Sequence, residues 1–133
     1  MKKTLFSFLL FLILLFIAGC SGKTYSFKNS VDEIESIEIV SAESSLEFTV
    51  TKTLSETEKQ DFLEQFQKIQ FDNYYIGDPM SVSGNSVKIT YKNGDYEIIC
   101  HYWAEYVKND DVYFVRKSCN EEEFNELLEK FLE

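Results

Sequence analysis

Residues 87–100, Val-Lys-Ile-Thr-Tyr-Lys-Asn-Gly-Asp-Tyr-Glu-Ile-Ile-Cys, carry the strongest local signal for the fold. Apolar and polar residues alternate on both sides of Asn93-Gly94, which is typical of strands with one buried face. Two-residue hairpin turns of type I′ require positive φ at both central residues. Asn and Gly tolerate positive φ, so such turns prefer the pair Asn-Gly. Such a turn predicts that paired residue numbers sum to 187, which puts Thr90 opposite Glu97 on the polar face.

A second turn signal follows at Lys108-Asn109-Asp110-Asp111. A turn centred on Asn109 and Asp110 predicts pair numbers that sum to 219, with the return strand at about 112–118. The returning strand of the first hairpin is then the outgoing strand of the second. The sequence therefore predicts a C-terminal three-stranded antiparallel meander.

Two helices are predicted from their start signals and their apolar spacing. Ser55 and Glu58 have the spacing of a capping box, and a helix should run over about 56–69. Asn120 caps a second helix, predicted over about 120–132, and acidic residues follow it in the first turn. Both helices carry apolar side chains at helical spacing, so each should pack one face on a sheet.

Further strands are predicted before the first helix, near 35–40 and over 46–50, with a turn at about 41–44. Residues 71–85 are rich in turn-forming types and predict an irregular connection. Taken together, residues 31–133 predict one α+β domain in which the two helices pack on an antiparallel sheet.

Composition limits the function classes. The chain has 133 residues, 16% of them aromatic, and a formal net charge of −10. Aromatic content at this level supplies a core and argues against disorder. An acidic surface repels phosphate groups, so nucleic-acid binding is excluded from the expected functions.

The first nineteen residues predict a signal peptide, to be excluded from the fold. Lys2 and Lys3 form a short basic region, and Leu5–Ala18 is a run of fourteen residues that is apolar except for Ser7. Fourteen residues are short for a membrane span, which needs about 20.

Ile17-Ala18-Gly19-Cys20 ends this segment and resembles the lipobox of bacterial lipoproteins. The resemblance implies that Cys20 carries a diacylglyceryl group, with acyl chains such as palmitate, after cleavage between Gly19 and Cys20. It implies a protein anchored in the cell membrane on the extracytoplasmic side, with residues 20–30 as a lipidated tether. The alternatives are an uncleaved membrane helix and an ordinary secretory signal.

Cys100 and Cys119 are the two other cysteines. The register that sums to 219 puts them directly opposite each other, and a disulfide persists outside the cytoplasm. The sequence therefore predicts a structural Cys100–Cys119 disulfide. Two free buried thiols are the alternative.

The second hairpin is predicted to be apolar on both faces. Tyr113 falls on the side of the two cysteines. The opposite side carries the predicted partner-binding residues Ile99, Trp103, Val112, Phe114 and Arg116. These residue types are enriched at protein interfaces. Alternatively, a strand or helix of the same domain covers this face.

The sequence predicts no catalytic, metal or cofactor site. His101 is the single histidine, and neither a nucleophile-elbow motif nor zinc spacing accompanies it. We therefore expect a non-catalytic, membrane-anchored module that binds another envelope protein. A small-molecule or peptide-binding lipoprotein is the alternative, with its pocket between the meander and residues 71–85.

Overall fold

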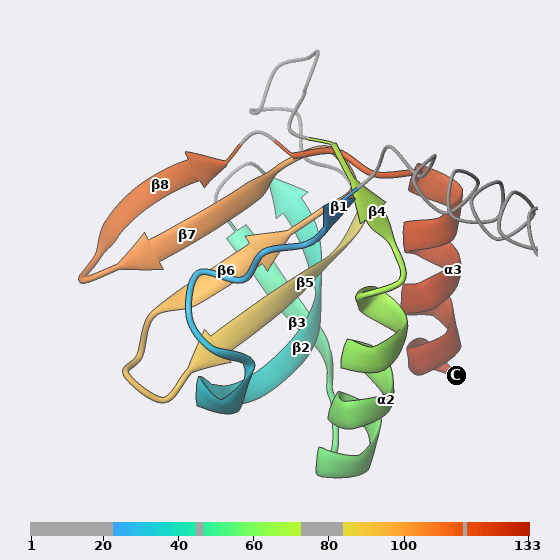
Figure 1. Cartoon of the computed structure of the whole chain (residues 1–133), viewed down its shortest axis with the longest axis horizontal. Coiled ribbons are helices and arrows are strands. Elements are labelled where there is room, and N and C mark those ends of the chain that lie inside the picture. The colour runs from blue at the N-terminus through green and yellow to red at the C-terminus, as the bar shows by residue number, and fades with distance from the viewer. Residues whose placement is uncertain (1–22, 45–46, 73–83, 116) are drawn as a thin grey trace, which may run out of the picture.

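The computed structural model describes residues 23–44, 47–72, 84–115 and 117–133. The predicted signal peptide and Cys20 lie outside these ranges. The chain forms an α+β fold, as predicted, with two helices and antiparallel strands (Figure 1). The elements in chain order are β1 (Lys23–Thr24), η1 (Val31–Glu33), β2 (Ile34–Ser44), β3 (Glu47–Thr53), α2 (Glu56–Phe66), β4 (Gln70–Phe71), β5 (Gly84–Tyr91), β6 (Tyr96–Ile99), β7 (Ala104–Lys108), β8 (Asp111–Val115) and α3 (Glu121–Leu132).

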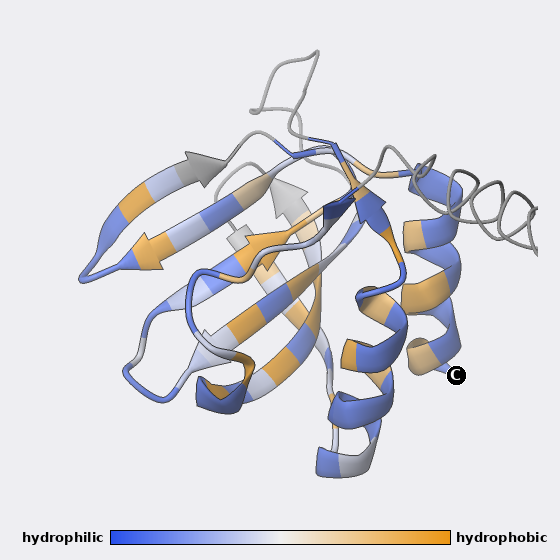
Figure 2. Ribbon diagram, in the orientation of Figure 1, coloured by the Kyte–Doolittle hydropathy of each residue, from blue (hydrophilic) through white to orange (hydrophobic). Residues whose placement is uncertain are grey.

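Six strands form the main sheet in the order β3-β2-β5-β6-β7-β8, and β1 pairs with β4 in a separate two-stranded ladder. Hydrophobic and polar residues alternate along β2 and β5, so one face of the sheet is apolar (Figure 2). The helices α2 and α3 lie side by side on that face (Figure 1). Their buried side chains, Phe62, Phe66, Phe124, Leu127, Leu128 and Phe131, join those of β2 and β5 in one core.

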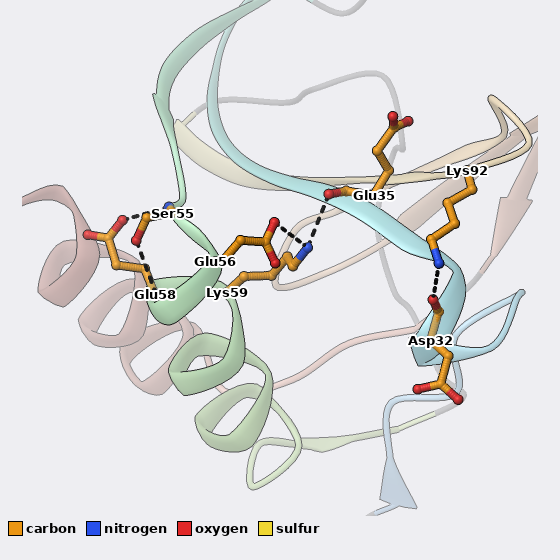
Figure 3. Close-up of polar contacts among 7 residues, drawn as sticks. All are labelled: Asp32, Glu35, Ser55, Glu56, Glu58, Lys59 and Lys92. Atoms are coloured by element: carbon orange, nitrogen blue, oxygen red, sulfur yellow. Dashed lines mark hydrogen bonds and ion pairs between the residues drawn. The ribbon is translucent and has the colours of Figure 1, made fainter.

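The capping box of α2 is confirmed. The amide of Glu58 donates to the Ser55 hydroxyl at 3.3 Å, and the Ser55 amide donates to the Glu58 carboxylate at 2.9 Å (Figure 3). The ammonium of Lys59 then ties the helix to the sheet through the carbonyl of Glu35 at 3.1 Å. The helix ends at Phe66, three residues before the predicted boundary, because a tighter turn leads into β4.

The first meander hairpin exists, but its predicted register is wrong by one residue. Its pairs sum to 186, so that Ile89 rather than Thr90 lies opposite Glu97. The Tyr91 amide donates to the Asp95 carbonyl at 2.8 Å, and the Gly94 amide donates to the Tyr91 carbonyl at 2.9 Å. These bonds close a three-residue loop in which Gly94 alone has positive φ, +90°, as in a G1-type turn.

The predicted meander contains one strand more than expected. The strand expected to run from Tyr96 into the second hairpin is broken at Cys100–Trp103, where the Cys100 amide donates to the Trp103 carbonyl at 3.0 Å. The meander is therefore β5-β6-β7-β8. Beyond the break the predicted sum of 219 holds for every pair of β7 with β8, and Asn109 and Asp110 form the turn with positive φ.

Two boundaries at the start of the domain also differ from the prediction. The strand β2 continues through the predicted turn at 41–44 and ends at Ser44; residues 45–46 lie outside the described residues. The predicted tether over 20–30 is shorter than expected, because Lys23 and Thr24 pair with β4 and the Tyr25 ring is buried. Of the predicted connection at 71–85, residues 73–83 lie outside the described ranges.

Candidate interaction surface

The five predicted partner-binding residues do not share one face. Ile99 is fully buried in the main core beneath the helices, and Trp103 is 3% exposed. Val112 is 49% exposed. The side chain of Phe114 and the whole of Arg116 lie outside the described part of the chain. The predicted common face is wrong because the turn at Cys100–Trp103 interrupts the alternation on which it relied. Binding of a partner by these residues stays a prediction.

Trp103 belongs to a second, smaller apolar cluster. Ile98, Cys100 and Trp103 are its buried members, and Phe48, Tyr96 and Tyr102 pack around them. Ile98 is next to Ile99 in β6, so it points to the opposite face of the sheet from the helices. Trp103 is therefore covered by other residues of the same domain, which was the alternative to partner binding.

The two most exposed large apolar residues of the described chain lie on β8, at the edge of the sheet. Val112 and the 51%-exposed Tyr113 are neighbours on this strand, which among the described residues pairs with β7 alone. They point to opposite faces of the sheet. Tyr113 was predicted on the side of the two cysteines, whereas in the structure it is half exposed at the edge strand. We call Val112 and Tyr113, together with the free edge of β8, the β8 edge.

The β7–β8 hairpin is fastened to the rest of the sheet through Tyr106. Its ring lies 6.2 Å from that of Tyr113, and its hydroxyl donates to the Asp95 carboxylate at 2.9 Å. Asp95 is itself buried, and its backbone amide donates to the side-chain oxygen of Asn93 at 3.0 Å. The β8 edge is thus presented by an anchored hairpin, which Figure 1 shows extending away from the helices.

Both cysteines are free thiols in the structure. The predicted register that put them directly opposite each other does not reach them, because Cys100 lies in the turn after β6. The two chain segments nevertheless meet, since the Cys119 amide donates to the His101 carbonyl at 2.7 Å. The disulfide stays a prediction. Burial raises the pKa of each thiol to about 12, so both are protonated at neutral pH.

His101 is half-buried beside this pair. Its Nε2 lies 3.8 Å from an exposed carboxylate oxygen of Glu121, and its ring packs edge-on against Tyr102. Burial lowers the pKa of His101, and the Glu121 carboxylate opposes this only in part. Among residues 23–44, 47–72, 84–115 and 117–133, no three potential metal ligands gather into a cluster.

Sequence reasoning missed Glu97, the largest polar side chain of the core. It is 1% exposed and lies on the helix-facing side of β6. Its carboxylate accepts hydrogen bonds from the Tyr25 hydroxyl at 2.8 Å, from the Lys28 amide at 3.1 Å and from the Tyr91 hydroxyl. Nearby charge and burial raise the pKa of both phenols, so each stays a donor.

The predicted ligand pocket next to residues 71–85 falls mostly outside the described residues. A groove of about 580 Å³ does lie between α2 and α3. Its lining is mainly charged, including Asp61, Glu64, Glu123 and Lys130, whereas small-molecule sites are mostly apolar and enclosed.

No helix within the described ranges is long and apolar enough to cross a membrane. Comparison with protein-family models, with curated proteins and with solved structures finds no match to this chain.

Proposed function

We propose that this protein is a lipoprotein, anchored through Cys20 to the outer face of the cytoplasmic membrane, that binds another envelope protein and catalyses no reaction. The lipobox-like Ile17-Ala18-Gly19-Cys20 and the preceding apolar run support the anchor. The observation that carries the binding role is the β8 edge.

The two edges of the sheet differ in how they are protected. At the β3 edge, pairing with β2 is interrupted by two register shifts, and the strand is rich in threonine, with Lys52 and Glu47. Bulges and charges of this kind keep an edge from pairing with another chain. At the β8 edge, five consecutive pairs with β7 are regular, and residues 112–115 read Val-Tyr-Phe-Val. A regular apolar edge is a template for a further strand from a partner.

Exposure supports the same assignment. Val112 and Tyr113 are the most exposed large hydrophobic residues of the described chain. Tyrosine is also a residue type that interfaces favour. We infer that a partner packs against both residues while it pairs with the backbone of β8.

The chemistry around His101 favours binding over catalysis. A Cys–His nucleophilic pair needs a thiolate, and a thiol with a pKa of about 12 supplies almost none at neutral pH. Within the described part of the chain, the ion-pair partner of the imidazole is an exposed glutamate, Glu121. His101→Ala should therefore leave the biological function of the protein intact.

Site-specific photo-crosslinking in the host tests the binding surface. A photoreactive residue at position 112 should crosslink to one envelope protein, and Tyr113→Lys should weaken that product. Position 50 is the matched control, because Val50 is 47% exposed on the opposite edge strand, against 49% for Val112. Equal crosslinking from both positions, or none from position 112, would contradict a role for the β8 edge.

A further inference from the structure

The chain just after Cys20 is built into the domain and does not hang from it as a linker. Lys23 pairs with Phe71 and Thr24 with Gln70 in the β1–β4 ladder. The Tyr25 ring is 4% exposed and packs edge-on against Phe71 at 5.1 Å between ring centroids. The segment 23–28 is therefore attached to the rest of the domain from its first residue, Lys23.

Two charged side chains fasten the same segment further along. The buried carboxylate of Glu97 accepts from the Tyr25 hydroxyl and from the Lys28 amide. The ammonium of Lys117 lies 4.2 Å from the centre of the Tyr25 ring and donates to the Ser26 carbonyl at 3.3 Å. Release of this segment would leave the Glu97 carboxylate buried without two of its donors, which is costly. The attachment point of the domain is thus rigid.

Only two residues, Ser21 and Gly22, lie between Cys20 and Lys23, so three Cα–Cα steps join them. A chain spans at most about 3.6 Å per residue, so the two Cα atoms lie no more than about 11 Å apart. We infer that a lipid on Cys20 holds the β1–β4 end of the domain against the surface of the bilayer, so that one fixed face of the molecule is turned to the membrane. This inference rests on the lipid anchor proposed above.

Backbone contacts identify what lies at the membrane end. Asp72, which follows β4, forms a bridge with Ser118, and the next residue, Cys119, bonds to His101. The turn at Cys100–Trp103 therefore lies at the same end as β1. The meander turns at Asn93-Gly94 and Asn109-Asp110 lie at the other ends of their strands, as Figure 1 shows.

Among the described residues, the membrane end carries charges of both signs, with Lys23 in β1 and Lys117 beside Ser26. The first turn of α3, which begins after Cys119 and the cap residue Asn120, adds Glu121, Glu122 and Glu123. These carboxylates oppose attraction to anionic lipid, so we attribute the orientation to the short attachment. Lengthening the attachment should therefore release the domain from the bilayer.

Energy transfer to the bilayer tests this orientation. Trp103 is the only tryptophan of the chain and lies at the membrane end. The probe is a phosphatidylcholine vesicle that contains dansyl-phosphatidylethanolamine and carries the full lipidated protein. Insertion of about 12 Gly/Ser residues between Gly22 and Lys23 adds roughly 20 Å of flexible chain. We expect this insertion to lower the transfer from Trp103 by about half or more.

A second variant moves the donor away from the membrane. Lys108 is exposed beside the distal turn of the β7–β8 hairpin, so Trp103→Phe combined with Lys108→Trp should transfer less than the native chain. With the long linker, the two donor positions should give similar values. Vesicle flotation keeps the two proposals apart. A chain that floats but shows the same transfer in all variants overturns the fixed orientation alone. A chain that fails to float overturns the lipid anchor and this inference together.

Discussion

At the scale of single residues, Glu97 shows how an acidic side chain is held inside an apolar core. A carboxylate without partners would cost several kcal/mol in such a place. Here three donors satisfy it, and two of them come from residues 25–28, about seventy positions away in sequence. The same contacts join the start of the domain to the middle of its sheet.

Removing one donor from Glu97 should destabilise the domain without changing its packing. Tyr25→Phe keeps the buried ring and deletes the hydroxyl, and a hydrogen bond to a carboxylate is worth about 2 kcal/mol. Urea unfolding should show this loss. Tyr113→Phe is the control, because Tyr113 is half exposed, and it should change the free energy of unfolding by less than about 0.5 kcal/mol. Equal effects of the two variants would contradict the role given to Glu97.

Sequence reasoning missed Glu97 because its local pattern is ambiguous. Ile98 and Ile99 are adjacent and both apolar, so either register buries one isoleucine. The Asn-Gly pair favoured a two-residue turn, and the side chain of Asn93 instead bonds to Asp95 across a three-residue loop. The observed register buries the Glu97 carboxylate, and the donors that offset the cost of this burial, Tyr25 and Lys28, lie far away in sequence. The sequence around Glu97 therefore gives no local signal for them.

At the scale of elements, the helices were predictable and the end of the sheet was not. For each helix, the cap residue and the apolar spacing predict the same start and the same buried face. The structure confirms both caps. The break at Cys100–Trp103 contains neither glycine nor proline, so nothing local predicted it. Which strand lies at an edge depends on the order of all six strands, so the exposure of Tyr113 could not be read from alternation.

The cap of α2 gives a prediction at this scale. Ser55→Ala deletes the hydroxyl that accepts the Glu58 amide and should lower the free energy of unfolding by about 1 kcal/mol. Ser55→Asp should retain most of the stability, because aspartate also caps helices. Ser30→Ala is the matched control, since Ser30 precedes η1 without a side-chain cap bond and should cost little. Thermal unfolding of the three variants measures this, and a loss in Ser30→Ala as large as in Ser55→Ala would refute it.

The pH dependence of the same cap has a defined sign. Hydrogen bonds from Lys52 and Ser55 lower the pKa of Glu58 to about 2. A carboxylate with a lowered pKa in the folded state stabilises the fold above its ordinary pKa, and this contribution is lost as the pH falls toward 2. The stability advantage of the native chain over Glu58→Gln should therefore shrink in acid, and urea unfolding at neutral and at acidic pH measures this.

At the scale of the whole molecule, the proposals describe a small α+β domain that is held close to a membrane and offers one edge strand to a partner. The helices cover one face of the sheet, and the β3 edge is protected by bulges. No described strand pairs with the outer side of β8, which lies on a hairpin that extends away from the helices (Figure 1). A rigid attachment at segment 23–28 would give that edge a constant height above the bilayer.

The intact mass of the protein from the membrane fraction of its host tests the central claim most directly. We predict a chain that begins at Cys20 and carries the added mass of a diacylglyceryl group, while Cys20→Ala should keep residues 1–19 and gain no lipid. A mature chain that lacks lipid, or a native chain that still begins at Met1, would contradict the account.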